Sequence, residues 1–132
     1  MTEVLRRTDM IKLVYIVRRR SDITVDEFRK YWLEKHGPLV RSFAKDLKAL
    51  KYIQSHTVEP ELNIQLAQAR GMLEAFDGIA ELWWESLDIF MNALTTPEGQ
   101  AANQALAKDE AAFIDLQGSH FFVTTEHTIF DY

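Results

Sequence analysis

The sequence contains no cysteine, only three prolines and five glycines, and no long uninterrupted run of apolar residues. A chain without cysteine forms no disulfide scaffold, thiolate metal centre or cysteine nucleophile. A membrane span needs about 18 consecutive apolar residues, so none is predicted. Basic residues are outnumbered, with 15 lysines and arginines against 20 aspartates and glutamates, and the net charge is −5. This balance disfavours nucleic acid and anionic membranes as partners.

Short catalytic motifs are missing as well. The sequence has no glycine-rich phosphate loop, no His-x-x-x-His or Glu-x-x-His pair, and no Gly-x-Ser-x-Gly segment. A nucleotide site, a helical metal site and a hydrolase nucleophile are therefore not predicted. The histidines stand apart, at positions 36, 56, 120 and 127. We expect no cofactor and no metal, and proton-transfer chemistry on a small hydrophobic organic ligand held among aromatic side chains.

The length of 132 residues predicts one domain over residues 1–132, with its core at about 10–130. With 47% hydrophobic residues the chain is too apolar for disorder. Residues 1–7 carry an early acid and no apolar run behind their arginines, so we expect no signal peptide and a cytoplasmic protein.

The first part of the chain predicts a strand followed by two helices. Residues 10–17 are apolar at both parities, which is typical of a strand buried on both faces. Thr24 and Glu27 have the spacing of a capping box at a helix start. Gly37 is expected to end that helix in the left-handed conformation, and Pro38 to begin the next one after a tight kink.

The remaining elements complete a ferredoxin-like pattern. We expect strands at 50–58, 76–84 and 120–126, helices at 86–94 and about 97–116, and a short helical excursion at 61–74. The order βαββαβ predicts an α+β fold, a four-stranded antiparallel sheet with helices on one face. Bulky residues occur at both parities, as in the pair Trp83 and Trp84. An exposed aromatic face is a liability, so we expect a homodimer formed by sheet-to-sheet pairing.

Three segments also resemble a known family. They are FRKYWLEKHGPL at residues 28–39, YIQSH at 52–56 and DGIAELW at 77–83. Together they resemble the EthD family, which is named for a pathway of ethyl tert-butyl ether degradation and belongs to the dimeric α/β-barrel superfamily. The likeness spans roughly residues 10–130.

The resemblance implies a ferredoxin-like protomer whose sheet pairs face to face with a second protomer. Members of the family isomerise lactones, or dehydrate, decarboxylate or cyclise polyketide-type and aromatic intermediates. Related branches of the superfamily bind haem or act as cofactor-free monooxygenases. The fold therefore follows from the resemblance more directly than the reaction does.

His36 has two interpretations. Its ordinary pKa of about 6.5 suits a general acid or base. It also stands near a predicted helix end, where an imidazole can cap carbonyl groups and interact with the helix dipole. The resemblance favours the catalytic interpretation, because the histidine of the family's motif is retained here.

Tyr52, Gln54 and His56 share one face of the second predicted strand, which we expect to point away from the helices. Burying three polar side chains without partners would cost several kcal/mol in total. They therefore lie at a water-exposed edge or line a polar cavity. The opposite parity, which includes Ile53, is expected to pack beneath the helices.

Parity in the third predicted strand puts Glu81 and Trp83 on the same side as His56. A carboxylate beside an imidazole can orient it, raise its basicity or act as the base itself. The alternative is a solvated strand glutamate. Four more residues are candidates for substrate binding, although each also has a purely structural interpretation: Tyr15, Trp32, Trp83 and His120.

The leading hypothesis is a cofactor-independent isomerase or lyase that uses general acid–base catalysis. His36 and His56 are its candidate bases, Glu81 is an orienting or acidic carboxylate, and Tyr52 and Gln54 are donors to an enolate-type oxygen. One alternative is a non-catalytic dimeric protein that binds a small ligand or serves a stress response. Another is a haem-binding or oxygen-activating barrel.

Overall fold

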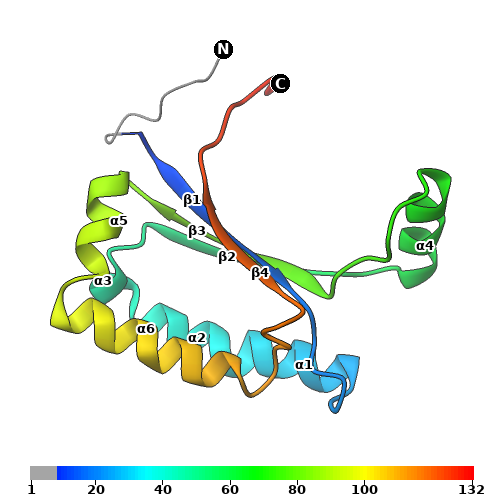
Figure 1. Cartoon of the computed structure of the whole chain (residues 1–132), viewed down its shortest axis with the longest axis horizontal. Helices are drawn as coiled ribbons and strands as arrows, with labels where there is room; N and C mark the ends of the chain where they lie inside the picture. The colour runs from blue at the N-terminus through cyan, green and yellow to red at the C-terminus, as the bar shows by residue number, and fades with distance from the viewer. Residues whose placement is uncertain (1–8) are drawn as a thin grey trace.

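The protein is described by a computed structural model over residues 9–132, so the predicted absence of a signal peptide concerns residues outside the described part. Four strands form one antiparallel sheet in the order β2-β3-β1-β4 (Figure 1). The expected ferredoxin-like α+β fold is confirmed. The strands are β1 (Ile11–Val17), β2 (Lys51–His56), β3 (Gly78–Trp84) and β4 (His120–Thr124).

Five α-helices lie on one side of this sheet, as expected, and the opposite face carries none of the helices drawn in Figure 1. A sixth helix, α4 (Pro60–Ala69), projects beyond the end of the sheet from the connection between β2 and β3, and it has no buried residue. The five are α1 (Val25–Tyr31), α2 (Gly37–Ser42), α3 (Ala44–Leu47), α5 (Leu87–Ala93) and α6 (Pro97–Glu110). No helix of residues 9–132 is long and apolar enough to cross a membrane.

The predicted capping box is present at the start of α1. The Thr24 hydroxyl accepts from the Glu27 backbone N–H, and the Glu27 carboxylate accepts from the Thr24 backbone N–H. The helix then buries Phe28 against the sheet side of the molecule. Helix α6 ends at Glu110, earlier than expected, because the following residues turn to pair with the chain after β1, with Ile114 bridged to Arg19.

The prediction of a left-handed glycine and a tight kink after α1 was wrong. Gly37 is right-handed helical, with φ of −54°. A π-helical segment, η1 (Trp32–His36), joins α1 to α2, and the Gly37 N–H donates to the Trp32 carbonyl. Pro38 has no N–H to continue the α-helical pattern, and a π-turn accommodates such a gap without ending the helix. His36 thus lies inside a continuous helical path.

The faces of β2 differ from the prediction. Tyr52, Gln54 and His56 lie opposite Leu82, Ala80 and Gly78, all on the helix-covered face. Because side chains alternate along a strand, their neighbours point the other way. The open face therefore carries Ile53, Glu81 and Trp83, and the expectation that Ile53 packs beneath the helices was wrong.

The two faces are also unequally buried. β1 and β3 alternate strictly between buried and half-buried residues, so β1 is not buried on both faces within the chain. The half-buried parity of β1 includes Val14 and Ile16, which face away from the helices. Tyr15, whose face was open in the sequence argument, lies on the helix side and is buried.

Candidate active site

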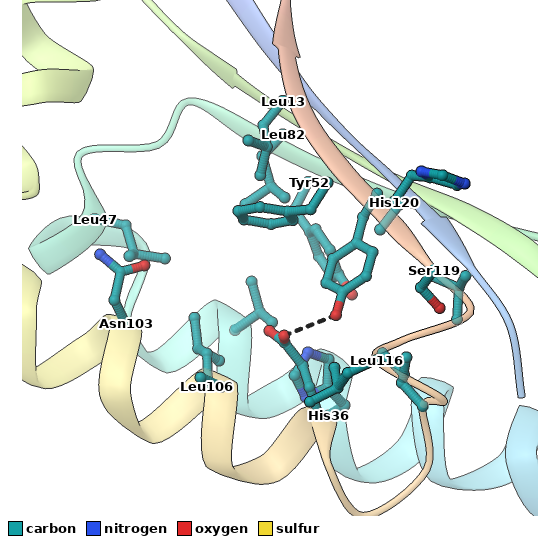
Figure 2. A pocket seen from close by; sticks show the side chains of 18 of the residues that line it. Leu13, His36, Leu47, Tyr52, Leu82, Asn103, Leu106, Leu116, Ser119 and His120 are labelled. Carbon is teal, nitrogen blue, oxygen red and sulfur yellow. Dashed lines mark hydrogen bonds between the residues drawn. The ribbon is translucent and has the colours of Figure 1, made fainter. Parts of the chain in front are cut away.

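A cavity of about 520 Å³ lies between the sheet and the helices (Figure 2). Strands contribute Leu13 and Leu82, and α6 contributes Leu106, so the wall is mostly apolar. The lining residues Leu116 and Phe121 are strongly exposed and mark its rim. A mostly apolar pocket of this size suits a small hydrophobic molecule. A few polar side chains interrupt the wall: Tyr15, His36, Tyr52, Asn103, Glu110, Ser119 and His120.

Glu110 closes one side of the cavity from the last position of α6. The Tyr15 hydroxyl of β1 donates to Oε1 of Glu110 over 3.0 Å, the bond drawn dashed in Figure 2. Burial raises the pKa of Glu110 to about 7, although the Tyr15 hydrogen bond opposes this. Burial also raises the pKa of Tyr15, and the neighbouring carboxylate adds to the effect. A neutral phenol and a readily protonated carboxyl group therefore face the cavity together.

His36 lies in the helical wall and is 5% exposed. Its Nδ1 is 2.8 Å from Oδ2 of Asp109, and the Tyr31 hydroxyl donates to Oδ1 of the same carboxylate over 2.5 Å. A carboxylate oxygen only accepts, so Nδ1 carries the hydrogen and Nε2 keeps its lone pair. Nε2 has no hydrogen-bond partner among residues 9–132. Burial lowers the pKa of His36 more than Asp109 raises it, which favours the neutral imidazole that a general base requires.

Tyr52, Gln54 and His56 form a hydrogen-bonded row along β2. The Gln54 amide nitrogen donates to the Tyr52 hydroxyl oxygen over 2.7 Å and to the Trp32 carbonyl over 2.8 Å, and its amide oxygen is 2.8 Å from Nε2 of His56. Because the Tyr52 oxygen accepts from Gln54, its own hydrogen is available to a ligand. Burial raises the pKa of Tyr52 to about 12, so it remains a donor at neutral pH.

Trp32 connects this row to the π-turn. Its ring is 1% exposed and stacks on the His56 ring with centroids 4.4 Å apart. The Trp32 carbonyl accepts from both Gly37 and Gln54, so the Gln54 side chain supports the segment that carries His36. Gly78 of β3 packs against the Trp32 ring, because a Cβ added at Gly78 would come within 2.6 Å of that ring.

Three polar side chains of the cavity can each act on a bound molecule in a different way. His36 can accept a proton through Nε2, Tyr52 can donate a hydrogen bond to an oxygen that gains charge, and Glu110 can exchange a proton. Figure 2 shows Tyr52 approaching from the sheet and His36 from the helical layer on the opposite side of the same space. Such a set can move protons on a carbonyl-containing substrate.

The structure brings some of the predicted site residues together and separates others. Tyr15, Trp32, His36 and Tyr52 line the cavity, whereas the side chains of Gln54 and His56 support it from behind Tyr52 and Trp32. His120, at the start of β4, also lines the cavity, although its ring points outward in Figure 2 and lies 6.0 Å from the Phe76 ring.

Glu81 and Trp83 lie on the open face, as the parity of β3 predicted, but His56 is not beside them because its parity of β2 turns towards the helices. Glu81 accepts from Lys12 Nζ over 2.9 Å, and Trp83 Nε1 donates to Glu126 over 2.6 Å. The helices bury the face of β3 that carries Leu82 and Trp84, as expected, and the polar parity of β2 pairs with that same face. The sequence argument therefore assigned the faces of β3 correctly and exchanged those of β2.

The sequence argument missed Asp109 and Glu110. Both stand near the end of a predicted helix of ordinary polar composition, where adjacent acids are usually solvated. Their partners, His36 and Tyr15, are far away in the chain. The only local signal was that the apolar residues Leu106 and Phe113 stand before and after the two acids in the sequence. Their spacing turns the end of α6 towards the core. Among residues 9–132 no three His, Asp or Glu side chains are grouped to hold a metal ion.

Comparison with known proteins identifies related sequences. Residues 20–117 match a family described as the EthD domain, which covers most of the chain. Dehydratase ustZ from Ustilaginoidea virens is 25% identical over 108 residues, corresponding to 80% of this chain and 75% of that protein.

Solved structures share the fold at lower sequence identity. An ethyl tert-butyl ether (EthD) family protein from Bacillus halodurans has a TM-score of 0.61 and 19% identity, over 89% of this chain and 99% of that chain. A hydroxynitrile lyase from Passiflora edulis has a TM-score of 0.62 and 11% identity, over 94% and 99%. SnoaB, a cofactor-independent oxygenase from Streptomyces nogalater, has a TM-score of 0.51 and 15% identity, over 91% and 95%.

Proposed function

The chain belongs to the EthD domain family, and we propose that it is a cofactor-independent lyase or isomerase that acts on a hydrophobic, oxygen-containing small molecule. One observation carries this proposal: an apolar cavity holds a buried histidine whose Nδ1 is bound to Asp109 and whose Nε2 is unpaired among the described residues. This is the arrangement of a general base directed at a bound substrate.

In the proposed reaction, Nε2 of His36 removes a proton from a carbon next to a carbonyl group. The charge that develops on the carbonyl oxygen is stabilised by the Tyr52 hydroxyl, which donates from the opposite wall. A donor of this kind acts strongly inside a cavity that excludes water. His56 and Gln54 hold the Tyr52 oxygen in place and are positioning residues in this proposal.

The relatives support lyase chemistry. The 25% identical protein is named a dehydratase, and the Passiflora edulis protein with the same fold is named a hydroxynitrile lyase. Both names describe elimination or cleavage of an oxygen-bearing molecule. SnoaB supports the absence of a cofactor, since its name describes a cofactor-independent enzyme.

A ketone probe tests this proposal. Benzylacetone is small, hydrophobic and has hydrogens beside its carbonyl, and proton NMR in heavy water follows their exchange for deuterium. We expect the wild-type protein to accelerate exchange and His36→Ala to lose about 100-fold of that acceleration. His127→Ala is the matched control, because His127 is not among the residues that line the cavity. Binding of benzylacetone without accelerated exchange would overturn the proposal in favour of a non-catalytic binding protein.

We further propose that two chains pair through the open face of the sheet. On this face, apolar residues surround an ionic cluster, and Ile53 and Phe122 are 37% and 46% exposed in the single chain. Lys12 contacts both Glu81 and Glu126 there. A second copy would cover these residues while leaving each cavity, on the other side of the sheet, within its own protomer. The family's fold is consistent with such pairing.

A further inference from the structure

We propose that Glu110 is a second catalytic residue and that the cavity dehydrates hydrophobic β-hydroxy carbonyl compounds. In this role Glu110 donates a proton to the departing hydroxyl group after His36 has removed the proton beside the carbonyl. The inference rests on the proposed function and deepens it, because it names the leaving group, its proton donor and the substrate class.

The hydrogen-bond geometry of Glu110 supports a proton donor. Its Oε1 accepts from the Tyr15 hydroxyl over 3.0 Å, and its Oε2 has no hydrogen-bond partner among residues 9–132. An oxygen that accepts a hydrogen bond from a phenol is the less suitable place for the carboxyl proton. The proton therefore resides on Oε2, which is left for a molecule in the cavity.

The charges around Glu110 also favour the protonated form. No lysine or arginine among residues 9–132 forms an ion pair with it. The titratable side chains that line the cavity with Glu110 are Tyr15 from β1, His36 from η1, Tyr52 from β2 and His120 from β4, and Asp109 precedes it on α6. The neighbouring Asp109 carboxylate raises the pKa of Glu110 in addition to burial.

Two adjacent carboxyl groups are thus placed in contrasting environments. Asp109 receives hydrogen bonds from Tyr31 and His36 and turns away from the cavity lining. Glu110 receives one hydrogen bond and faces an apolar cavity. Different surroundings for neighbouring carboxyl groups separate their roles, with the ionised one supporting the base and the protonated one acting as acid.

The reaction balances without an oxidant or a further reactant. The C–H bond beside the carbonyl breaks, its proton moves to Nε2 of His36, and a carbon–carbon double bond forms as the C–O bond to the hydroxyl breaks. The hydroxyl takes the Oε2 proton of Glu110 and leaves as water. The resulting imidazolium and carboxylate return to their starting forms when one proton passes from His36 to Glu110.

A matched pair of probes separates the two catalytic groups. Benzylacetone reports proton removal alone, whereas the aldol adduct of benzaldehyde and acetone adds a hydroxyl group and yields benzalacetone on loss of water. We expect Glu110→Gln to lower formation of benzalacetone by about 100-fold and to lower exchange of benzylacetone far less. His36→Ala is expected to lower both, and His127→Ala neither.

The pH profile of Tyr15→Phe tests whether Glu110 transfers a proton, because a purely structural role of Glu110 would leave that profile unchanged. This variant keeps the Glu110 carboxyl group but removes a hydrogen bond that lowers its pKa. The upper limb of the pH profile for benzalacetone formation is expected to shift to higher pH, while the profile for benzylacetone exchange stays in place.

The outcomes distinguish this inference from the proposed function. Failure of the wild-type protein to exchange benzylacetone overturns the proposed function. Exchange with no formation of benzalacetone, or elimination that survives in Glu110→Gln, overturns the role of Glu110 alone. Release of benzaldehyde in place of benzalacetone would assign carbon–carbon cleavage and likewise overturn dehydration.

Discussion

The Nδ1 atom of His36 lies 2.8 Å from Oδ2 of Asp109, a residue 73 positions away in the chain. The contact joins the π-turn after α1 to the end of α6. It selects the imidazole tautomer that leaves Nε2 as a proton acceptor in the cavity. The proposed base is therefore positioned by helix packing across the molecule and not by a local motif.

Replacing Asp109 by Asn tests this tautomer. The Asn amide can donate to Nδ1, which would move the imidazole hydrogen to Nε2 and remove the lone pair that accepts the substrate proton. We expect the rate of benzylacetone exchange to fall about 100-fold with little change in probe binding. Nitrogen NMR of the histidine ring would show the change of tautomer. An unchanged tautomer with unchanged exchange would contradict the role of Asp109.

Tyr52→Phe removes the donor opposite His36 while keeping the aromatic ring. We expect the maximal exchange rate to fall roughly 100-fold, the size typical of losing one donor to a developing oxyanion. The Michaelis constant should change much less, because the ring still fills its place in the wall. Gln54→Glu is the companion variant, since it keeps an acceptor for His56 but loses the amide donor to Tyr52 and the Trp32 carbonyl. Equal rates in wild type and Tyr52→Phe would remove Tyr52 from the mechanism.

Glu110 should make stability depend on pH. Burial raises the pKa of Glu110 from 4.5 to about 7, so the folded state holds this proton more tightly than the unfolded chain. Its contribution to the free energy of unfolding is full below pH 4.5 and declines as pH rises through about 7. Relative to Glu110→Gln, the free energy of unfolding of the wild type is expected to fall by a few kcal/mol across this pH range. Urea denaturation of both proteins measures the difference.

His36 contributes to the pH dependence of stability in the opposite sense. The wild type is therefore compared with Glu110→Gln, which keeps His36. Burial lowers the pKa of His36, so its contribution is full above the ordinary value of 6.5 and is lost as pH falls. This contribution is common to wild type and Glu110→Gln and cancels in their difference. Parallel stability curves for the two proteins would show that Glu110 is not desolvated.

Gly78→Ala should destabilise the fold. An added Cβ would lie 2.5 Å from the Ser55 carbonyl oxygen and 2.6 Å from the Trp32 ring, both of which are held in place by the sheet and the helical layer. We expect a loss of about 2 kcal/mol in the free energy of unfolding. Gly37→Ala is the control, because Gly37 is right-handed helical and its Cβ would make contacts of 3.4 Å and 3.5 Å. A smaller loss at position 78 than at position 37 would contradict this packing.

Trp83→Glu tests pairing through the open face. The change adds a carboxylate beside Glu81 and Glu126 and removes the indole that donates to Glu126. We expect a two-chain species for the wild type in analytical ultracentrifugation at micromolar concentration, and a monomeric, aggregated or unfolded variant. The wild type's midpoint of unfolding should also rise with protein concentration.

Leu73→Glu is the control for this experiment. Leu73 follows α4, lies outside the sheet and is 93% exposed. Its replacement should leave sedimentation unchanged. Dissociation caused by Leu73→Glu but not by Trp83→Glu would assign pairing to the α4 region, and a folded wild-type monomer would exclude the dimer.

Much of the fold was predictable because its signals are local. The capping box at Thr24, the apolar strands and the order βαββαβ depend on residues close together in the chain, and the structure confirms the elements they predicted. The family resemblance rested on such local segments too, and the match over residues 20–117 confirms it. His36 was found in the same way, because it lies within one of these segments.

Tertiary structure decided which side each residue faces and which groups meet. Alternation along a strand shows that Tyr52 and His56 share a face, but with apolar residues at both parities it does not say which face the helices cover. Burial of Leu82 and Trp84 beneath the helices turned Glu81 outward and Tyr52 inward. The partners of His36 and Tyr15 came from the end of α6, far away in the sequence. Packing of distant elements, which no local pattern encodes, thus converted two ordinary helix acids into a base-orienting carboxylate and a buried acid.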